Sequence, residues 1–364
     1  MRILAVDIGT ATQDILLFDS SRVVENCIKM IMPSPTAVLA ERISRATSCG
    51  HPILFTGVTM GGGPSKRALR RHTSAGLPAY ATAEAALTFN DDLAVVKGMG
   101  VTIVEPGEVI GKTDMEIIDL KDLDLTAIRR AFDAFGVDCG FDAVAVAVLD
   151  HGYAPPGVSN RLFRFQYLEH LMAERKDLAA FAYLGHELPD YLTRMKAVAI
   201  SVDADLPVLL MDTGASAVLG VLQDREVSRR DHMVIVNMGN SHVVAFHLQS
   251  GLIQGLLEHH TNLLNGGKLD DLAGRLWLGT ISSSEVYEDG GHGAVIMGKS
   301  RGKPFVAVTG PRQDILAGSQ MRLHRAVPHG DVMLAGCYGL VSACGLRIDA
   351  WREEIAQALR AISK

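Results

Sequence analysis

The chain has 364 residues, 48% of them hydrophobic and 21% charged, and a formal net charge of −6. This length exceeds what one hydrophobic core usually covers, so two domains are expected. The acidic balance leaves no excess of cations to neutralise phosphates, and no stretch approaches the roughly 18 uncharged apolar residues of a membrane helix, so neither nucleic acid nor a membrane is expected as a partner.

The first segment predicts three meander strands around a turn of small residues, then a helix and a further strand. The strands are expected at residues 3–7, 14–19, 22–29 and 52–56, the turn at 8–12 and the helix near 36–48. A glycine-rich loop and a basic helix follow the last of these strands.

The segment from residue 233 repeats this pattern. Asn237 lies 230 residues after Asp7, and the same offset sets Gly239 over Gly9. Strands are expected at 233–237, 242–248, 252–258 and 304–309, and helices at about 262–278, from 338 and at 350–362. A duplicated unit of three meander strands with alternating helices predicts an α/β fold of two ribonuclease-H-like lobes that face each other across a cleft.

The predicted boundaries are 1–91 for the first lobe and 231–364 for the second, with an inserted α/β segment at 92–230. Within the insertion, residues 142–149 and 208–212 read as apolar strands, 125–135 and 159–174 as helices, and 217–223 as a returning strand. Residues 107–113 come close to a P-loop but have one residue too few between the glycines.

The turn Asp7-Ile8-Gly9-Thr10 has the composition of a phosphate-binding turn. Gly9 lets the backbone approach a phosphate, and the turn's N–H groups and the hydroxyls of Thr10 and Thr12 can donate to its oxygens. The Asp7 carboxylate can hold Mg²⁺ through water.

The chain resembles the actin-like ATPase superfamily of sugar and acetate kinases, heat-shock chaperones and actin. The resemblance rests on the turn at Asp7, on residues 233–258 in the place of the second phosphate motif, and on residues 305–311 in the place of the adenosine loop. It implies ATP and Mg²⁺ as cofactors and phosphate contacts from Asn237, Gly239, Asn240 and Ser241. Gly310 and Pro311 would then border the base.

The whole chain also resembles an uncharacterised prokaryotic family labelled "putative pyruvate formate-lyase activating enzyme". The resemblance lies in residues 6–14, 59–64, 150–152, 236–240 and 258–261. Residues 125–200 are loosely similar to the hydantoinase and oxoprolinase branch. A glycyl-radical activase needs three cysteines around an iron–sulfur cluster, and the required spacing is missing.

The five cysteines form neither a CxxC pair nor an even set, which favours reduced thiols and a cytoplasmic location; they are Cys27, Cys49, Cys139, Cys337 and Cys344. The second phosphate turn carries Asn237 where the superfamily has an acidic residue. Asparagine supplies no charge to a metal, so rapid ATP hydrolysis is in question while nucleotide binding is not.

Asp212-Thr213-Gly214 permits three interpretations. It can be the true second phosphate turn because it keeps the acid, it can be a structural hairpin, or it can be half of an aspartic-protease pair, which the α/β pattern disfavours. Separately, Gly61, Gly62 and Gly63 precede a basic helix that carries Lys66, so this loop is a candidate anion site for a substrate.

Histidines and acids stand at the ends of several strands. Asp150 and His151 are candidate catalytic residues for proton transfer. His242, Glu258, His259 and His260 are candidate ligands for Zn²⁺, Mn²⁺ or Fe²⁺. Adjacent strand residues point to opposite faces, so only one of His259 and His260 is expected in a shared site.

The leading functional hypothesis is an enzyme that binds ATP–Mg²⁺ between two lobes and transfers a phosphoryl group to a small metabolite, or activates it by hydrolysis. One alternative is a nucleotide-gated activator without fast turnover. Another is a metal-dependent hydrolase of a cyclic amide that uses the histidines. The substrate is left open, and a homo-oligomer is compatible with the sequence.

Overall fold

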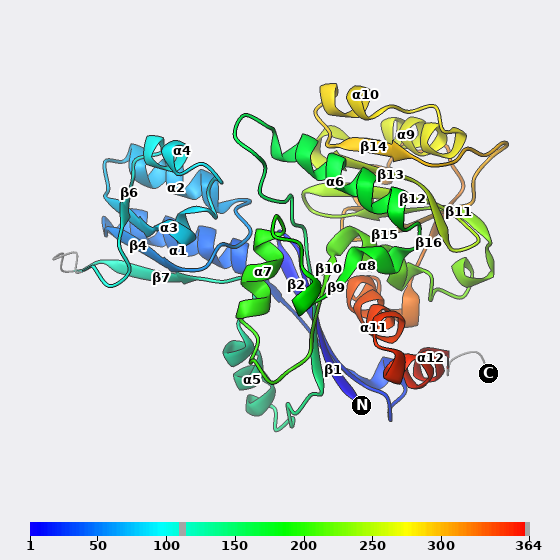
Figure 1. Ribbon diagram of the computed structural model, residues 1–364, viewed down its shortest axis with the longest axis horizontal. Helices are drawn as coiled ribbons and strands as arrows, with labels where there is room; N and C mark the ends of the chain where they lie inside the picture. The colour runs from blue at the N-terminus through cyan, green and yellow to red at the C-terminus, as the bar shows by residue number, and fades with distance from the viewer. Residues whose placement is uncertain (109–113, 361–364) are drawn as a thin grey trace.

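The computed structural model describes residues 1–108 and 114–360, which form three β-sheets with helices around them (Figure 1). The first sheet has the strand order β3-β2-β1-β8-β10-β9. Its strands are β1 (Arg2–Ile8), β2 (Thr12–Asp19), β3 (Ile28–Pro33), β8 (Ala143–Val148), β9 (Ala182–Leu184) and β10 (Val208–Asp212). This sheet and its helices are called the first lobe.

The second sheet has the order β14-β13-β12-β11-β15-β16 and forms the second lobe. Its strands are β11 (His232–Met238), β12 (His242–Gln249), β13 (Leu252–His260), β14 (Gly293–Ile296), β15 (Val306–Thr309) and β16 (Leu323–Arg325). In both sheets three antiparallel meander strands are followed by two strands that continue parallel to the first one. The predicted pair of ribonuclease-H-like lobes is therefore confirmed.

The two first hairpins repeat each other residue by residue. Strand β1 pairs with β2 from Arg2↔Asp19 to Ile8↔Gln13, and β11 pairs with β12 in the same register 230 residues later. The turns also agree, because the Gly9 N–H donates to the Thr12 carbonyl over 2.9 Å and the Gly239 N–H donates to the His242 carbonyl over 2.9 Å.

A third, four-stranded sheet projects to one side of the first lobe (Figure 1). We call it, with its helices, the side subdomain: β4 (Ile53–Gly57), β5 (Ala79–Thr82), β6 (Val101–Val104), β7 (Glu116–Leu120), α1 (Pro35–Cys49), α2 (Ser65–Ser74), α3 (Ala83–Ala86) and α4 (Leu93–Gly98). Its apolar cluster is made of its own residues, among them Phe55 and Phe89.

The sheets assign two groups of strands differently from the sequence interpretation. The strand expected at 52–56 in the first lobe lies in the side subdomain, whereas β8 and β10, expected in the insertion, are the parallel strands of the first lobe. The reason is burial: every residue of β8 is buried, which fits the sheet centre beside β1.

The remaining helices cover the faces of the two large sheets. They are α5 (Leu125–Ala134), α6 (Asn160–Glu174), α7 (Thr193–Ile200), α8 (Thr213–Val221), α9 (Gly266–Leu278), α10 (Ser283–Glu288), α11 (Ala335–Arg347) and α12 (Arg352–Arg360). Helices α5 and α7 pack on the outer face of the first sheet and α9 on that of the second. Helices α6, α8 and α11 share one apolar core with the inner faces of both.

Helices α8 and α11 touch through their backbones. A Cβ atom on Gly220 would lie 1.8 Å from the Ala335 carbonyl oxygen, and one on Gly339 would lie 1.8 Å from the Ser216 carbonyl oxygen. No side chain fits at either contact, so glycine is required for this close crossing.

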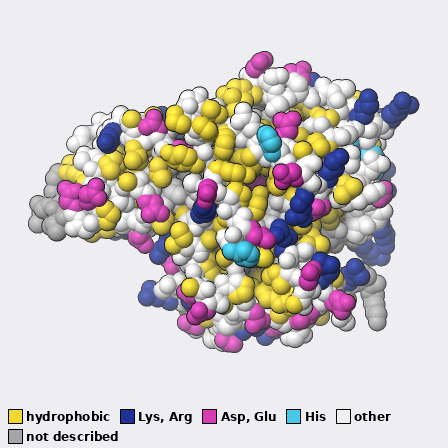
Figure 2. Space-filling view, in the orientation of Figure 1, with side chains coloured by type: hydrophobic (Ala, Val, Ile, Leu, Met, Phe, Trp, Pro, Cys, Tyr) yellow, Lys and Arg dark blue, Asp and Glu magenta, His cyan; other side chains and the backbone are white. Residues whose placement is uncertain are grey.

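The segment that resembles a P-loop lies mostly outside the described residues, as do the last two residues of the helix expected at 350–362. Within the part of the chain that the structure describes, no helix has both the length and the apolar character needed to cross a membrane. Figure 2 shows hydrophobic side chains gathered along the band where the side subdomain meets the rest of the molecule.

Candidate functional site

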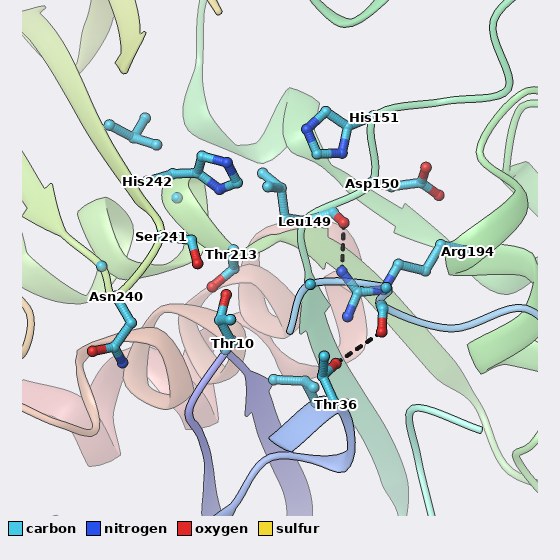
Figure 3. Close-up of a pocket in the computed structure, with 18 of the residues that line it drawn as sticks. Thr10, Thr36, Leu149, Asp150, His151, Arg194, Thr213, Asn240, Ser241 and His242 are labelled. Atoms are coloured by element: carbon cyan, nitrogen blue, oxygen red, sulfur yellow. Dashed lines mark hydrogen bonds between the residues drawn. The ribbon is translucent and has the colours of Figure 1, made fainter. Parts of the chain in front are cut away.

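A cavity of about 870 Å³ lies where the two lobes and the side subdomain meet, a size typical of small-molecule sites. Figure 3 shows part of its lining, with the Thr10 turn opposite Ser241 and His242. Residues that the sequence singled out make up much of the wall: Asp7, Gly9, Thr10, Thr12, Gly61, Gly62, Gly63, Lys66, Asp150, His151, Asn237, Gly239, Asn240, Ser241, His242, His260, Gly310 and Pro311. Glu258 and His259 do not line the cavity.

The glycine loop of the side subdomain lies against the Gly9–Thr12 turn. A Cβ atom on Gly63 would lie 3.5 Å from Thr10 Cγ2. Thr36 donates to the Gly61 carbonyl over 3.0 Å (Figure 3), and the Gly61 N–H donates to the Asp122 carboxylate at 3.2 and 3.3 Å. Because that N–H is already used, Gly62, Gly63 and Lys66 are the parts of the loop that face an open site.

Lys66 gives this wall a positive charge. Burial lowers the pKa of its ammonium group, while Asp91 nearby raises it. Asp91 in turn accepts a hydrogen bond of 2.7 Å from Asn160 on α6. A lysine on the wall of a cavity favours a ligand with an anionic group.

Two carboxylates stand face to face below the first turn. Asp7 and Asp14 are paired across β1 and β2. Burial raises the pKa of Asp7 to about 7, and burial together with the charge of Asp7 raises the pKa of Asp14 to about 8. Thr213 donates to Asp7 Oδ1 over 2.6 Å, whereas Asp14 Oδ1 is buried without a partner. The nearby charges that act on the pair are those of Asp212 and Asp331, and both raise its pKa values further.

Asp212 and Thr213 begin α8 and do not form the hairpin that was one of the interpretations. Asp212 Oδ1 accepts from the N–H groups of Gly214 and Ala215 at 2.9 and 3.4 Å, which makes Asp212 the N-cap of the helix. Thr213 and Gly214 line the same cavity as the hairpin turns. The Asp212–Gly214 segment and the turn after Asn237 were the two alternatives for the second phosphate turn. Both line the same cavity, from different elements.

Arg164 on α6 links two buried acids from different lobes. Its Nη2 lies 2.8 Å from Asp212 Oδ2, and its Nε lies 2.7 Å from Glu258 Oε2. It also donates to the Tyr167 hydroxyl over 2.8 Å. All the charged partners are buried, so this ion network is largely screened from water.

Asp150 is held by backbone groups. Its Oδ1 accepts from the Gly152 N–H over 2.8 Å and its Oδ2 accepts from the Met195 N–H over 2.9 Å. Burial raises the pKa of this carboxyl, which these hydrogen bonds and Arg194 counteract. In Figure 3 the side chain points away from His151. Both oxygens are thus engaged in fixing the loop after β8, and a catalytic role for Asp150 stays a prediction.

Three histidines and one glutamate gather at the second hairpin. His151, His242, Glu258 and His292 place their ligand atoms within 4.8 Å of one another. Burial lowers the pKa of His242 to about 4 and that of His292 to about 3, and it holds the pKa of His151 well below its usual value. The imidazoles are therefore neutral at physiological pH. Burial opposes ionisation of Glu258, but Arg164 holds its pKa below the ordinary value.

Strand alternation separates His259 from His260, as expected from the sequence. His260 lines the cavity, and its ring centroid lies 5.0 Å from that of His242 and 4.7 Å from that of His292. His259 points to the opposite face, where its Nε2 lies 3.1 Å from Asp289 Oδ2.

The loop after β15 closes the far end of the cavity. Gly310 has φ +97°, and a Cβ atom there would lie 2.5 Å from the Met238 carbonyl oxygen. The Thr309 hydroxyl beside it is buried without a partner. Gly310 and Pro311 line the cavity next to Asn237, where the resemblance places the nucleotide base.

Asp14, His292 and Arg164 are among the residues of the site that the sequence interpretation did not select. Asp14 had a usable signal, because the predicted hairpin pairs it with Asp7. His292 stands in the loop Gly290–Gly293, and Arg164 is one of two arginines on α6, a helix that also carries Phe163, Phe165 and Tyr167. Neither belongs to the repeat, so the pattern in the sequence gave no reason to select them.

No cysteine belongs to the group of His151, His242, Glu258 and His292. Cys27, Cys337 and Cys344 are buried, whereas Cys49 is exposed. In the described ranges, the set of residues with ligand atoms close enough for a metal ion contains no cysteine. The ligands of an iron–sulfur cluster are thus not gathered anywhere in that part of the chain.

Residues 60–315 match the family described as "Putative pyruvate format-lyase activating enzyme (DUF1786)". The chain belongs to this family. No curated protein matches the sequence. The family segment includes the glycine loop, the second hairpin and all four residues of the histidine–glutamate group, but it begins after the Gly9–Thr12 turn.

Several solved structures are similar to the chain at low identity. An exopolyphosphatase from Cytophaga hutchinsonii is 13% identical, with a TM-score of 0.26 over 75% of this chain and 53% of its own, so the chain spans about half of that protein's length. The ethanolamine utilization protein EutJ from Carboxydothermus hydrogenoformans is 10% identical, with a TM-score of 0.30 over 93% of this chain and 89% of its own. A Ppx/GppA protein from Aquifex aeolicus is 8% identical, with a TM-score of 0.28 over 85% of this chain and 66% of its own.

Proposed function

We propose that the protein binds ATP with Mg²⁺ in the cavity and uses it to phosphorylate, or to activate by hydrolysis, a small metabolite. The observation that carries the proposal is the pair of hairpin turns, alike in register and in their glycine hydrogen bond, on one cavity. Two sets of turn N–H groups from opposite sides suit a ligand with several phosphates.

The acid pair supports Mg²⁺ as part of the ligand. Asp7 and Asp14 face each other across the first hairpin, the charges of other acids raise the pKa of both, and the buried Asp14 Oδ1 has no hydrogen-bond partner. Hard divalent cations take oxygen ligands of this kind, often through water. When bound, Mg²⁺ would neutralise phosphate charge, and Asp7 and Asp14 are the residues that would hold it.

Phosphates would be bound by backbone N–H groups of the two hairpin turns. The Gly9–Thr12 and Gly239–Ser241 turns face the cavity from the two lobes, and the start of α8 faces it from the first lobe, with the N–H groups of Gly214 and Ala215 already donating to Asp212. The dipole of α8 adds partial positive charge at that end. Gly310 and Pro311 would lie beside the base.

The second substrate would bind toward the side subdomain. Lys66 and the loop of Gly62 and Gly63 form the wall next to Thr10. A metabolite with a carboxylate or phosphate group suits the charge of Lys66. On the opposite side, the neutral ring of His151 lines the cavity and is the candidate for proton transfer as long as its ring nitrogen holds no metal ion.

A second candidate function is a nucleotide-gated activator without fast turnover. It is favoured by Asn237, which stands in the second turn where Asp7 stands in the first and brings no charge. In that case the nucleotide would only bias the lobes between open and closed arrangements.

Thermal-shift and calorimetric titrations with ATP, ADP and AMP, each with and without Mg²⁺, test the proposal. We expect ATP with Mg²⁺ to raise the Tm, and Asp7→Asn to remove the Mg²⁺-dependent part of the shift. Asp19→Asn, at the far end of the same strand pair, is the matched control and should behave as wild type. If no adenine nucleotide binds the wild-type protein, the proposal is wrong. ATP turnover then separates the two candidates, since binding without turnover favours the activator.

A further inference from the structure

The group of His151, His242, Glu258 and His292 has the composition of a transition-metal site. Each residue offers one ligand atom, and the four atoms lie within 4.8 Å of one another. We propose that these residues bind one divalent first-row transition metal ion of the zinc type. The proposal rests on these four side chains and does not depend on ATP or on Mg²⁺ at Asp7.

The four ligands come from four separate segments that converge. His151 follows β8, His242 begins β12, Glu258 lies on β13, and His292 precedes β14. His151 Nε2 and His292 Nε2 are 3.0 Å apart, and His292 Nε2 lies 3.7 Å from Glu258 Oε1. The His242 ring is 4.8 Å from the His292 ring and 5.9 Å from the His151 ring, centroid to centroid. Ring nitrogens that face one another in this way share one small volume.

Glu258 provides the decisive detail. Its Oε2 is fixed by Arg164 Nε at 2.7 Å, while its Oε1 is buried without any hydrogen-bond partner and points toward the histidines. A buried carboxylate oxygen without a partner is costly, so it calls for a ligand. Arg164 orients the carboxylate in the manner of the outer residues that position metal ligands.

The ligand set points to the class of metal. Three imidazoles and one carboxylate match the nitrogen-and-oxygen sites of Zn²⁺, and also of Fe²⁺ and Mn²⁺, and they differ from the all-oxygen sites of Mg²⁺. His260 lies next to the group without belonging to it. The cavity borders the group on the side of His151, His242 and His292, so a bound ion could also be reached by a substrate.

A second histidine pair in the same lobe is the natural comparison. His232 Nε2 and His247 Nε2 are 2.8 Å apart, and the Ser300 hydroxyl lies 2.8 and 3.2 Å from the two nitrogens. This pair has a hydroxyl partner and no carboxylate, and it lies outside the set with metal-ligand spacing. Two neighbouring histidines are thus not enough to indicate a metal site. The group around Glu258 differs from this pair because it adds a carboxylate and a third imidazole.

Metal binding would connect the lobes. His151 belongs to the first lobe, whereas the other three ligands belong to the second. An ion held by all four would join the loop after β8 to the second sheet. We therefore expect the metal to raise the Tm of the wild-type protein, and to do so less in His151→Gln.

The test uses the full chain, stripped with a chelator, refilled with Zn²⁺ and desalted, with Mn²⁺ and Fe²⁺ as parallel arms. Metal content by mass spectrometry should reach one equivalent per chain for at least one of these ions. Calorimetric titration should give an affinity that falls about 100-fold or more in His242→Gln and His292→Gln. If the wild-type protein retains only traces of all three ions, or if both variants bind as the wild type does, the proposal is overturned.

Two controls make the result specific. His247→Gln removes a buried histidine from the same strand as His242 and should leave the stoichiometry and affinity unchanged. Asp7→Asn should also bind Zn²⁺ normally, which separates this site from the proposed Mg²⁺ site. If His292→Gln does not fold, His151→Gln and His242→Gln, which change partly exposed side chains, decide the question alone.

Discussion

The β1–β2 and β11–β12 hairpins have the same backbone and different chemistry. They agree in register and in the hydrogen bond that closes each turn. Asp7 and Asp14 in the first correspond to Asn237 and Val244 in the second, and Thr12 corresponds to His242. The first hairpin thus presents carboxylates, and the second presents imidazole. The comparison teaches that the repeat preserves the backbone of the hairpin and its turn, while the side chains that each copy presents to the cavity differ.

The largest effect is expected at Arg164, which we infer compensates the charges of the buried acids Asp212 and Glu258. Arg164→Met should lower the free energy of unfolding by about 3–5 kcal/mol, because it leaves Asp212 and Glu258 buried without their partner. Urea unfolding followed by circular dichroism measures this. The control is Arg175→Met, which breaks an ion pair with Asp177 that is roughly half exposed and should cost at most about 1 kcal/mol. Equal losses in the two variants would contradict the assigned role of Arg164.

The next effect concerns catalysis at the first hairpin. If the protein turns over ATP, Asp7→Asn should lower kcat by about 100- to 1,000-fold, since a charge placed to stabilise the reacting phosphate is lost. Asn237→Asp supplies the missing carboxylate to the second turn and should raise turnover several-fold. Steady-state phosphate release measures both variants. Unchanged rates in both would mean that the difference between the two turns has no role in turnover.

The two hairpins should also respond to pH with opposite signs. In the folded protein the Asp7–Asp14 pair has pKa values of about 7 and 8, above the ordinary 3.8, so the folded state holds the proton more tightly. Their contribution to stability is therefore complete below about pH 4 and is lost as the pH rises through 7 to 8. Mg²⁺ should restore stability at the alkaline end.

For His242 and His292 the folded-state pKa values of about 4 and 3 lie below the ordinary 6.5. Their contribution is present above 6.5 and is lost as the pH falls toward 3 to 4. Denaturant unfolding across this range, in a chelating buffer, should show the alkaline loss reduced in Asp14→Asn and the acid loss reduced in His292→Gln. The same pH profile in all three proteins would count against both assignments.

The smallest expected effect concerns how tightly the backbone is packed around the glycine of each hairpin turn. A Cβ atom on Gly239 would lie 2.8 Å from the His242 carbonyl oxygen, and one on Gly9 would lie 3.1 Å from that of Thr12. Gly239→Ala should therefore destabilise the protein by about 1–3 kcal/mol, and Gly9→Ala by less. The energetic cost of the steric clash rises steeply as the distance between the added Cβ atom and the carbonyl oxygen becomes shorter. Thermal unfolding of the two variants side by side checks the order, and the reverse order would show that the turns relax differently.

The sequence was sufficient for whatever is local and repeated. Alternating apolar strands and small-residue turns are short-range patterns, and the offset between Asp7 and Asn237 made the second hairpin recognisable. Asp14 was within reach, since a hairpin fixes which residue faces Asp7. Prediction failed where position depends on long crossover connections. Strand β8, which is fully buried, and β10, which is buried except at Val208, join the first sheet although they are far from β1 in chain order. His292 and Arg164 reach the site through the same long-range packing.

The crossing of α8 and α11 has a mechanical consequence. Between Gly220 and the Ala335 carbonyl, and between Gly339 and the Ser216 carbonyl, no side chain separates the two helices. Helix α8 leads from the first lobe into the second and α11 returns from the second to the first, so the two helices that connect the lobes meet at this contact. A side chain at either glycine would push the helices apart and would move the lobes that they connect.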